Sequence, residues 1–353
     1  MLLTNGTRRR PVTAFVLASA IAVALVAAQF DRGASGATPP NPRLPSLTTI
    51  KQLKVPYFGL EFIAADRGFF TKYNLDVEFV TQVAQGAAGI PAIISNQVQT
   101  GQGFGVNTPL QARAGGGNVT AVVAGLLSTG GDYRFYSTAD SDIKTAKDLV
   151  GKTVGVVTLG AYPDIALQVW FYNNGVPLNQ VRRTQVPLSA MCDALLRHQV
   201  DVVGMYSLFY NACEKTNPGK LRLLFKDSDI LPSAKLYSAY VFTDDYIKAN
   251  RGVVRAYVAA IKDATAFVKA NPNRAKDIIS KATNISPDLI VVPNYPKGNC
   301  IDLQSAARWV KIMIDYDAIK QGSVKPLEWV TNEFNPGCPL TLKQQLAQQK
   351  RKK

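Results

Sequence analysis

Histidine is nearly absent from this chain of 353 residues, which contains one, His198. A single histidine excludes the two-histidine motif of zinc metalloproteases and any metal site built from a cluster of histidines. Beyond residue 30 there is also no apolar run long enough to span a bilayer, which excludes a protein with several membrane-spanning helices. Hydrophobic residues make up 47% of the chain, so it can bury a full core and a disordered chain is excluded.

Several enzyme motifs are also missing. Residues 148–153 resemble the end of a phosphate-binding loop, but Ala146 stands where the first glycine of that motif belongs. Residues 101–105 are rich in glycine without the spacing of a dinucleotide-binding loop, and no G-x-S-x-G sequence occurs. His198 follows Arg197 at the end of an expected helix and is interpreted as an exposed helix-terminal residue. We therefore expect a protein that is not an enzyme and that needs no metal or cofactor.

Negative charge is scarce, because 40 Lys and Arg face 25 Asp and Glu and leave a net charge of +15. About half of this excess lies at the two ends, in Arg8, Arg9 and Arg10 and in the five basic residues of segment 341–353. The remainder contains no basic stripe interleaved with aromatic residues, so we expect no nucleic acid as a partner. Segment 341–353 has few large apolar residues and is expected to be a disordered basic tail.

The three arginines precede an uncharged apolar run at residues 12–28, which is the pattern of an export signal. We expect residues 1–28 to be a cleaved signal peptide, with a second possible cleavage after Ala37 and a retained anchor as the alternative. No cysteine follows the run, so a lipid-anchored form is excluded. Residues 29–46, rich in Gly, Ala, Pro and Ser, are expected to be a linker. The protein should thus act in the periplasm or another extracytoplasmic compartment.

Cysteine occurs four times, as Cys192, Cys213, Cys300 and Cys338, and no C-x-x-C pair is present. Four cysteines in an exported protein favour two disulfides, for which three pairings are possible. We favour pairing between neighbours in the sequence, Cys192 with Cys213 and Cys300 with Cys338. Four buried free thiols are the alternative.

Short strands alternate with helices after residue 47, in two successive units. The expected strands are residues 48–55, 76–80, 103–106, 119–127, 152–158, 182–186, 201–206 and 221–225. From residue 244 the pattern is almost entirely helical, with expected helices at 251–270, 272–282 and 302–320. We predict an α/β protein with two layered, mainly parallel domains, onto which the C-terminal helices pack.

Glycine, aromatic and small polar residues follow the expected strands of both units, at the edge where open α/β sheets bind ligands. They are Tyr57, Phe58, Gly59, Gln85, Gly86, Asn107 and Thr108 in the first unit, and Leu159, Gly160, Ala161, Tyr162, Met205, Tyr206 and Ser207 in the second. Each turn opens a helix, whose free N–H groups favour anionic groups. Together they predict a ligand site formed by both units. Glu61 is a further candidate that would accept a hydrogen bond from an amine, unless it lies on a solvated helix face.

A family resemblance accompanies these turns. Residues 55–59 (VPYFG), 63–70 (IAADRGFF) and 74–78 (NLDVE), followed by 143–158 and 200–203, occur in order. This series resembles periplasmic solute-binding proteins of ATP-binding-cassette (ABC) importers, in the branch for nitrate, sulfonate, taurine and thiamine precursors. The resemblance covers roughly residues 48–282.

The resemblance implies a type II periplasmic-binding-protein fold, with two lobes joined by two crossover strands and the ligand in the cleft between them. On this sequence lobe one would comprise residues 47–134 and 242–340, and lobe two residues 135–241. The crossover strands would be residues 133–137 and 237–243.

The resemblance also implies a function. A monomer would capture a small organic ligand by hinge closure and deliver it to the membrane permease of an ABC importer. The expected ligand is mono-anionic or neutral and partly apolar, because the turns contain few cations and several aromatic residues. A solute-sensing adaptor for another membrane partner is one alternative. An enzyme similar to pyrimidine-precursor synthases is the other, although this chain lacks the histidines and the cysteine-rich motif of those enzymes.

Overall fold

The computed structural model describes residues 41–54, 59–81, 89–102, 105–128, 131–231 and 235–351. The expected signal peptide and residues 29–40 of the expected linker lie outside these ranges. Pro42–Lys353 forms one unit, to which the following description is confined. Within the described ranges, no helix has both the length and the apolar character needed to cross a bilayer.

The sheet of the first lobe is assembled from two pairs of strands. Its strands are β1 (Thr48–Lys54), β2 (Leu75–Thr81), β3 (Val119–Ala124) and β9 (Ala239–Thr243). β1 and β2 are parallel, and β3 and β9 are antiparallel. Thr100 bridges Gln52 of β1 while Gly101 bridges Val241 of β9, so these two residues join the pairs. The resulting order is β2, β1, the 100–101 segment, β9 and β3.

The second lobe contains a five-stranded sheet in the order β6-β5-β7-β4-β8. Its strands are β4 (Tyr133–Thr138), β5 (Thr153–Val156), β6 (Arg182–Gln185), β7 (Val202–Tyr206) and β8 (Leu221–Lys226). β5 runs parallel to β6 and β7, whereas β4 runs antiparallel to β7 and β8. In each lobe one strand directly follows the crossing from the other lobe: β9 in lobe one and β4 in lobe two. β9 lies between the 100–101 segment and β3, and β4 lies between β7 and β8. Both sheets therefore have the same topology.

The expected crossover strands coincide with β4 and β9. Residues 133–137 belong to β4, and most of 237–243 belongs to β9, so both segments pair inside the sheets. The chain passes between the sheets just before them, and the described residues there are 125–128, 131–132, 231 and 235–238, among which Leu127 bridges Leu236. β9 is buried along its whole length, because an arriving strand with two neighbours is covered on both sides. β4 thus begins at Tyr133 and β9 at Ala239.

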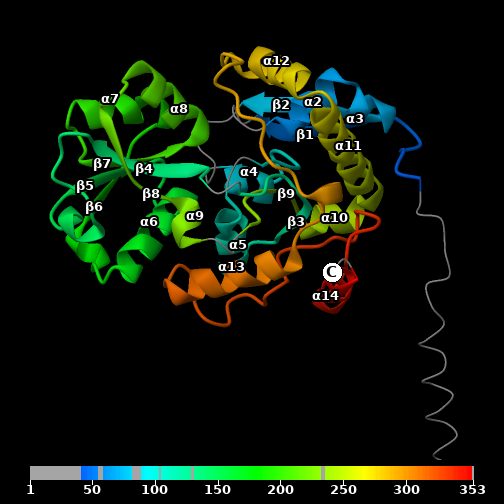
Figure 1. The fold of residues 1–353 in the computed structure, drawn as a ribbon. Coiled ribbons are helices and arrows are strands. Elements are labelled where there is room, and N and C mark those ends of the chain that lie inside the picture. Colours follow the sequence, from blue (N-terminus) through cyan, green and yellow to red (C-terminus); the bar gives the residue numbers. More distant parts are fainter. Residues whose placement is uncertain are drawn as a thin grey trace, which may run out of the picture. The chain divides into compact units, whose positions relative to one another are not determined.

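Helices cover the sheets and fill the C-terminal third of the chain (Figure 1). They are α2 (Leu60–Asp66), α3 (Phe69–Lys72), α4 (Gly89–Ile94), α5 (Asn107–Ala114), α6 (Tyr162–Asn173), α7 (Met191–Leu196), α8 (Ser207–Thr216), α9 (Asp227–Ile230), α10 (Asp244–Ala249), α11 (Arg251–Ala270), α12 (Pro272–Thr283), α13 (Leu303–Asp315) and α14 (Leu342–Lys350). α11 packs against α2 and α3 of lobe one. The prediction that the C-terminal helices pack on an existing domain is confirmed.

The strand predicted at residues 103–106 is misplaced. The ladder contacts lie earlier, at Thr100 and Gly101, while Val106 already caps α5. Residues 103 and 104 lie outside the described ranges. Asn107 and Thr108, which were expected to form the turn after that strand, are instead the first two residues of α5.

Two disulfides join the four cysteines, Cys192 to Cys213 and Cys300 to Cys338. The favoured pairing between sequence neighbours is confirmed. The first bond links α7 to α8, which flank β7 of lobe two. The second bond closes a loop that contains α13.

The expectation of a disordered tail is wrong for residues 342–350, which form α14. Thr341 caps this helix by accepting a hydrogen bond from the Gln344 N–H. The Gln345 side chain is buried, and its Oε1 accepts a hydrogen bond from the Leu303 N–H at 2.8 Å. Its Nε2 donates to Asp302 Oδ1 at 2.7 Å. Polar contacts with the start of α13 thus order a segment that has little apolar surface to bury.

Replacement of Gln345 by Ala should lower the free energy of unfolding by about 1–2 kcal/mol, because the buried Leu303 N–H loses its acceptor. Calorimetric unfolding of the wild type and the variant measures the change. Gln348→Ala, an exposed glutamine on the same helix, is the matched control and should be nearly neutral. Equal effects of the two substitutions would contradict an anchoring role for Gln345.

Candidate ligand-binding site

The residues predicted to bind ligand lie at four places in the described structure. Gly59 and Glu61 begin α2, Asn107 and Thr108 begin α5, Leu159, Gly160, Ala161 and Tyr162 lead into α6, and Met205, Tyr206 and Ser207 join β7 to α8. Tyr57, Phe58, Gln85 and Gly86 lie outside the described residues. Each described group lies in a turn between a strand and a helix, or in the first turn of the helix.

The start of α5 in lobe one touches the turn before α6 in lobe two. Asn107 Nδ2 donates a hydrogen bond to the Gly160 carbonyl at 2.8 Å. A Cβ atom on Gly105 would lie 2.7 Å from Tyr162 Cβ, so the two backbones approach closely. Gly160 has φ +76°, in the left-handed region where glycine is favoured. The structure therefore brings Asn107 and the 160–162 turn together across the two lobes.

Aromatic rings cluster beside this contact. The ring of Tyr162 lies 5.8 Å from Tyr133, 4.8 Å from Tyr237 and 5.7 Å from Trp309, measured between centroids. Tyr206 lies 5.6 Å from Tyr133 and 6.5 Å from Tyr237. Two of the predicted residues, Tyr162 and Tyr206, thus share one cluster with Tyr133 and Tyr237, which we name the tyrosine cluster.

Sequence reasoning missed Tyr133, Tyr237 and Trp309 as members of this region. The first two lay in the expected crossover strands, which were treated as connections. Because such connections pass the ligand region, their position in the sequence could have identified Tyr133 and Tyr237 as candidates. Trp309 lies on α13, more than a hundred residues from Tyr162 in sequence, and its indole N–H donates to the Leu236 carbonyl at 2.8 Å. No local pattern marks it.

The N-terminus of α6 is already supplied with a carboxylate from the protein itself. The Gly160 N–H donates to Asp164 Oδ2 at 2.7 Å, and Arg183 pairs with the same oxygen at 2.7 Å. Asp164 is buried with 1% of its side chain exposed. An anionic ligand group at this turn would have to compete with that carboxylate, which weakens the expectation that the turn binds an anion.

Two further carboxyl groups lie near the tyrosine cluster. The Tyr162 hydroxyl donates to Asp227 Oδ2 at 2.9 Å. Burial, followed by the nearby charge of Asp132, raises the pKa of Asp227 to about 7. The environment of Tyr162 is therefore rich in acceptors.

Glu61 is fully buried, which contradicts its interpretation as a residue on a solvated helix face. Its Oε2 accepts hydrogen bonds from the Tyr240 hydroxyl at 2.7 Å and from Gln102 Nε2 at 3.5 Å. Among the described residues its Oε1 has no hydrogen-bond partner. Burial raises the pKa of Glu61 to about 7, and hydrogen bonds from Tyr240, from the Glu61 backbone and from Gln102 only partly oppose this effect.

A chain of hydrogen bonds links Glu61 to the connections between the lobes. Beyond Gln102, the Ser238 hydroxyl donates to Gln102 Oε1 at 3.0 Å. Ser238 Oγ in turn accepts from the Leu126 N–H at 3.1 Å. Leu126 and Ser238 belong to the two segments that cross between the sheets, so the position of the Glu61 carboxyl is coupled to both crossings.

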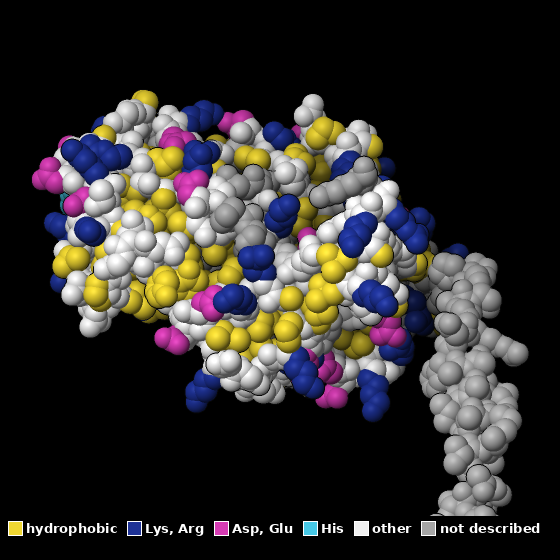
Figure 2. Space-filling model, turned by 60° about the horizontal axis from the view of Figure 1, so that its bottom comes forward, with side chains coloured by type: hydrophobic (Ala, Val, Ile, Leu, Met, Phe, Trp, Pro, Cys, Tyr) yellow, Lys and Arg dark blue, Asp and Glu magenta, His cyan; other side chains and the backbone are white. Residues whose placement is uncertain are grey.

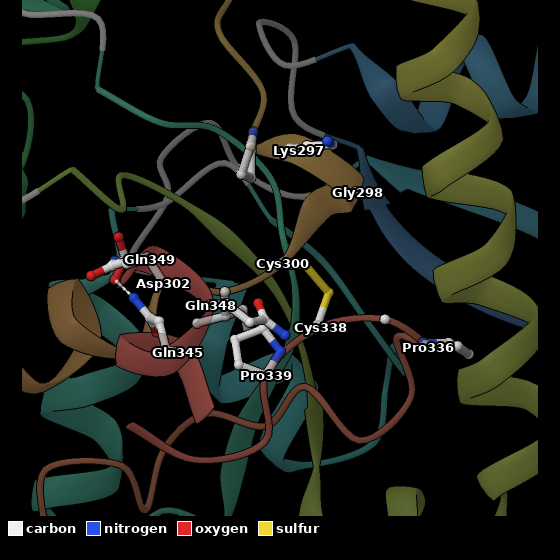
Figure 3. Close-up of a pocket in the computed structure, with 13 residues that line it drawn as sticks. Lys297, Gly298, Cys300, Asp302, Pro336, Cys338, Pro339, Gln345, Gln348 and Gln349 are labelled. Atoms are coloured by element: carbon white, nitrogen blue, oxygen red, sulfur yellow. Dashed lines mark hydrogen bonds between the residues drawn. A yellow bond between two sulfur atoms is a disulfide. The ribbon is translucent and has the colours of Figure 1, made fainter. Parts of the chain in front are cut away.

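A separate hollow of about 480 Å³ lies beside the Cys300–Cys338 disulfide (Figure 3). α14 contributes Gln345, Gln348 and Gln349 to its wall, and Lys297 lies on the opposite side. None of the predicted ligand residues lines it. Nor do the described residues contain a group of three His, Cys, Asp or Glu side chains that could hold a metal ion.

The sequence matches a known family over more than half of its length. A family model described as NMT1/THI5 like covers residues 55–275. The chain belongs to this family. A relative from Brucella abortus (strain 2308), provisionally named a binding protein, is 26% identical over 230 residues, which are 64% of this chain and 68% of the relative.

Solved structures show the fold of this NMT1/THI5-like chain. The alkanesulfonate-binding protein SsuA from Xanthomonas axonopodis, bound to MOPS, superposes with a TM-score of 0.67 at 14% identity, over 81% of this chain and 99% of that one. The periplasmic nitrate-binding protein NrtA from Synechocystis gives 0.64 at 13% identity, over 79% and 84%. The predicted periplasmic-binding-protein fold is confirmed. The desulfurization enzyme DSZB also shares it, with a TM-score of 0.57 at 14% identity, over 81% and 97%.

Glu61→Gln should make the free protein more stable at high pH. Because burial raises the pKa of this carboxyl from 4.5 to about 7, ionising it opposes folding. The penalty is absent below about pH 4.5, grows as the pH rises, and is complete above about pH 7. The variant should therefore gain up to about 3 kcal/mol at pH 8 and little at pH 4.

Denaturant unfolding at the two pH values measures this difference. Glu78→Gln, which removes an exposed carboxyl from β2, is the control and should show no such dependence on pH. A Glu61→Gln variant that is less stable than the wild type at pH 8 would contradict a penalty from the buried charge.

Proposed function

We propose that this chain is the solute-binding component of an ABC importer. It would capture a small organic molecule between its lobes outside the cytoplasm, as a monomer, and present it to a membrane permease. The observation that supports this most is the contact of Asn107 with the 160–162 turn, because it joins the two sheets where each strand gives way to a helix. A ligand bound there touches both lobes.

Closure of the lobes around the solute would be a hinge motion. The two crossing segments are short, and Leu127 and Leu236 bridge each other within them. Hinge motion needs only a few residues to change their backbone angles. A solute favours the closed form only to the extent that it binds that form more tightly, so contacts from both lobes are required.

The proposed solute is partly apolar and is not a strong anion. The tyrosine cluster gives this region a buried aromatic surface, which suits an apolar part of a solute. Of the two charge states expected from the sequence, the neutral one is favoured over the mono-anion, since Asp164 already occupies the start of α6 and Asp227 and Glu61 lie buried nearby. MOPS is the ligand of the sulfonate-binding neighbour and is not carried over to this chain.

Two further observations favour binding over other activities. The Brucella relative is named as a binding protein, and the sequence lacks the enzyme motifs considered above. On the face drawn in Figure 2, Lys and Arg side chains are scattered among acidic and apolar ones rather than gathered into a stripe. That distribution supports a small-molecule ligand over a nucleic acid.

Gly160→Val should weaken solute binding by roughly tenfold or more, because a branched side chain at a positive φ distorts the turn that Asn107 contacts. A thermal-shift screen of sulfonates, small organic anions, neutral compounds and nitrogen heterocycles identifies a binding compound, and calorimetry with that compound measures the loss.

Gly175→Val is the matched control, since Gly175 also has a positive φ, +66°, and follows the opposite end of α6. Both variants should lose comparable stability from backbone strain, yet only Gly160→Val should lose affinity. Equal affinity in the two variants would show that the ligand does not lie at the 160–162 turn.

A further inference from the structure

Glu61 combines complete burial with an oxygen that has no hydrogen-bond partner. Oε2 is engaged by Tyr240 and Gln102, while Oε1 is unpaired. An ionised carboxylate in the interior is costly unless a cation or several donors satisfy it. Here the two donors are neutral and both bond to the same oxygen.

A cation from the protein does not fill this role. None of the ion pairs among the described residues includes Glu61. The intervening sequence segments contain no lysine or arginine that could serve instead; they are residues 55–58, 82–88, 103–104, 129–130 and 232–234. Within the part of the chain that the structure describes, the charge of Glu61 therefore has no counterion.

The surroundings of Glu61 place it beside the region where the lobes join. Gln102 links Glu61 to Ser238, which in turn is bonded to Leu126. Ser238 and Leu126 lie in the two crossing segments. Burial, followed by the nearby charge of Glu61, raises the pKa of Tyr295, which follows Asn294, a residue that bridges Leu127 of the first crossing segment. The Tyr295 hydroxyl is also buried without a hydrogen-bond partner. Two unpaired polar groups thus occur together beside the segments that cross between the lobes.

We infer that the solute carries a protonated nitrogen group, such as an ammonium, an amidinium or a protonated heterocycle, which donates a hydrogen bond to Oε1 of Glu61. This inference rests on the proposed function and specifies the chemistry of its ligand. The solute is then positively charged rather than neutral. The buried carboxylate would attract such a cation and repel an anion. The Tyr295 hydroxyl is the second group available to the same part of the solute.

Binding of such a solute should strengthen as the pH rises through about 7, where Glu61 loses its proton. The titratable groups that face it are the phenols of Tyr240 on β9, Tyr257 on α11 and Tyr295. Burial raises the pKa of each phenol, so all three stay neutral in this range. Glu61 is then the group that sets the pH dependence.

A panel of compounds with one shared ring tests the inference. Benzamidine and benzylamine are cations, benzyl alcohol is neutral, and benzoate and benzenesulfonate are anions. Calorimetry at pH 8 should detect binding of a cation by the wild-type protein, weakened roughly tenfold or more in Glu61→Gln. Tyr295→Phe should weaken it less. Glu78→Gln, which removes the same charge from the surface, should leave the affinity unchanged.

The outcomes separate this inference from the proposed function. Preferential binding of benzoate or benzenesulfonate, with an affinity that Gly160→Val reduces and Glu61→Gln does not, would overturn the inference and the charge proposed for the solute, while the capture of a small molecule between the lobes would stand. Cation binding that is unchanged in Glu61→Gln would also overturn it, and would make the carboxyl a structural group bonded to internal water. Failure of every compound to bind would count against both.

Discussion

The packing of Tyr162 against Tyr237 and Trp309 is the interaction on which the arrangement of the two lobes depends. Tyr162 begins α6 of the second lobe, Tyr237 lies in a crossing segment, and Trp309 comes from a helix near the end of the chain. One buried ring therefore connects three parts of the sequence that are far apart. Its hydroxyl is held by Asp227, so the ring orientation is set by a hydrogen bond as well as by contact. Aromatic pairs of this kind add to the stabilisation that burial alone provides.

Around this contact the molecule keeps an unusual amount of buried negative charge. Asp164 is balanced by Arg183, and Asp227 lies beside Tyr162. Among the described residues neither Asp227 nor Glu61 pairs with a cation, and Glu61 differs in having one carboxylate oxygen without a hydrogen-bond partner. A fold that needed only stability would not retain such a group, since a neutral side chain of similar size would avoid the cost of burying it. Retaining strain or charge at a stability cost is typical of binding sites, where the ligand supplies the missing partner.

Much of the fold could be predicted from the sequence because its signals are local. The alternation of strands and helices, the amphipathic C-terminal helices and the resemblance of residues 55–78 to the family all lie within short windows. The errors occurred where the decisive contacts are long-range. β4 and β9 read as connections because their place inside a sheet depends on partners elsewhere in the chain. α14 is ordered by Gln345, whose side chain accepts a hydrogen bond from the Leu303 N–H. The amino-acid composition of the segment does not indicate this contact.

The site was predictable to the extent that it follows from topology. Residues of the two units were expected to form one site, and Asn107 at the start of α5 does contact the Gly160 carbonyl. The chemistry of those turns was not predictable, because it depends on which groups the protein already uses, such as Asp164 at the start of α6. Glu61 was recognised as an acceptor, but its burial was not, since the flanking residues of α2 carry a pattern that also suits a surface helix.

Hydrogen–deuterium exchange of the free protein and of the protein saturated with its tightest-binding screened compound tests most directly whether the solute is held by both lobes. The proposed function predicts slower exchange on binding in two separate stretches, residues 59–66 with 105–114 of lobe one and residues 157–165 of lobe two. Protection confined to one lobe, or to the residues around the Cys300–Cys338 disulfide and α14, would contradict it.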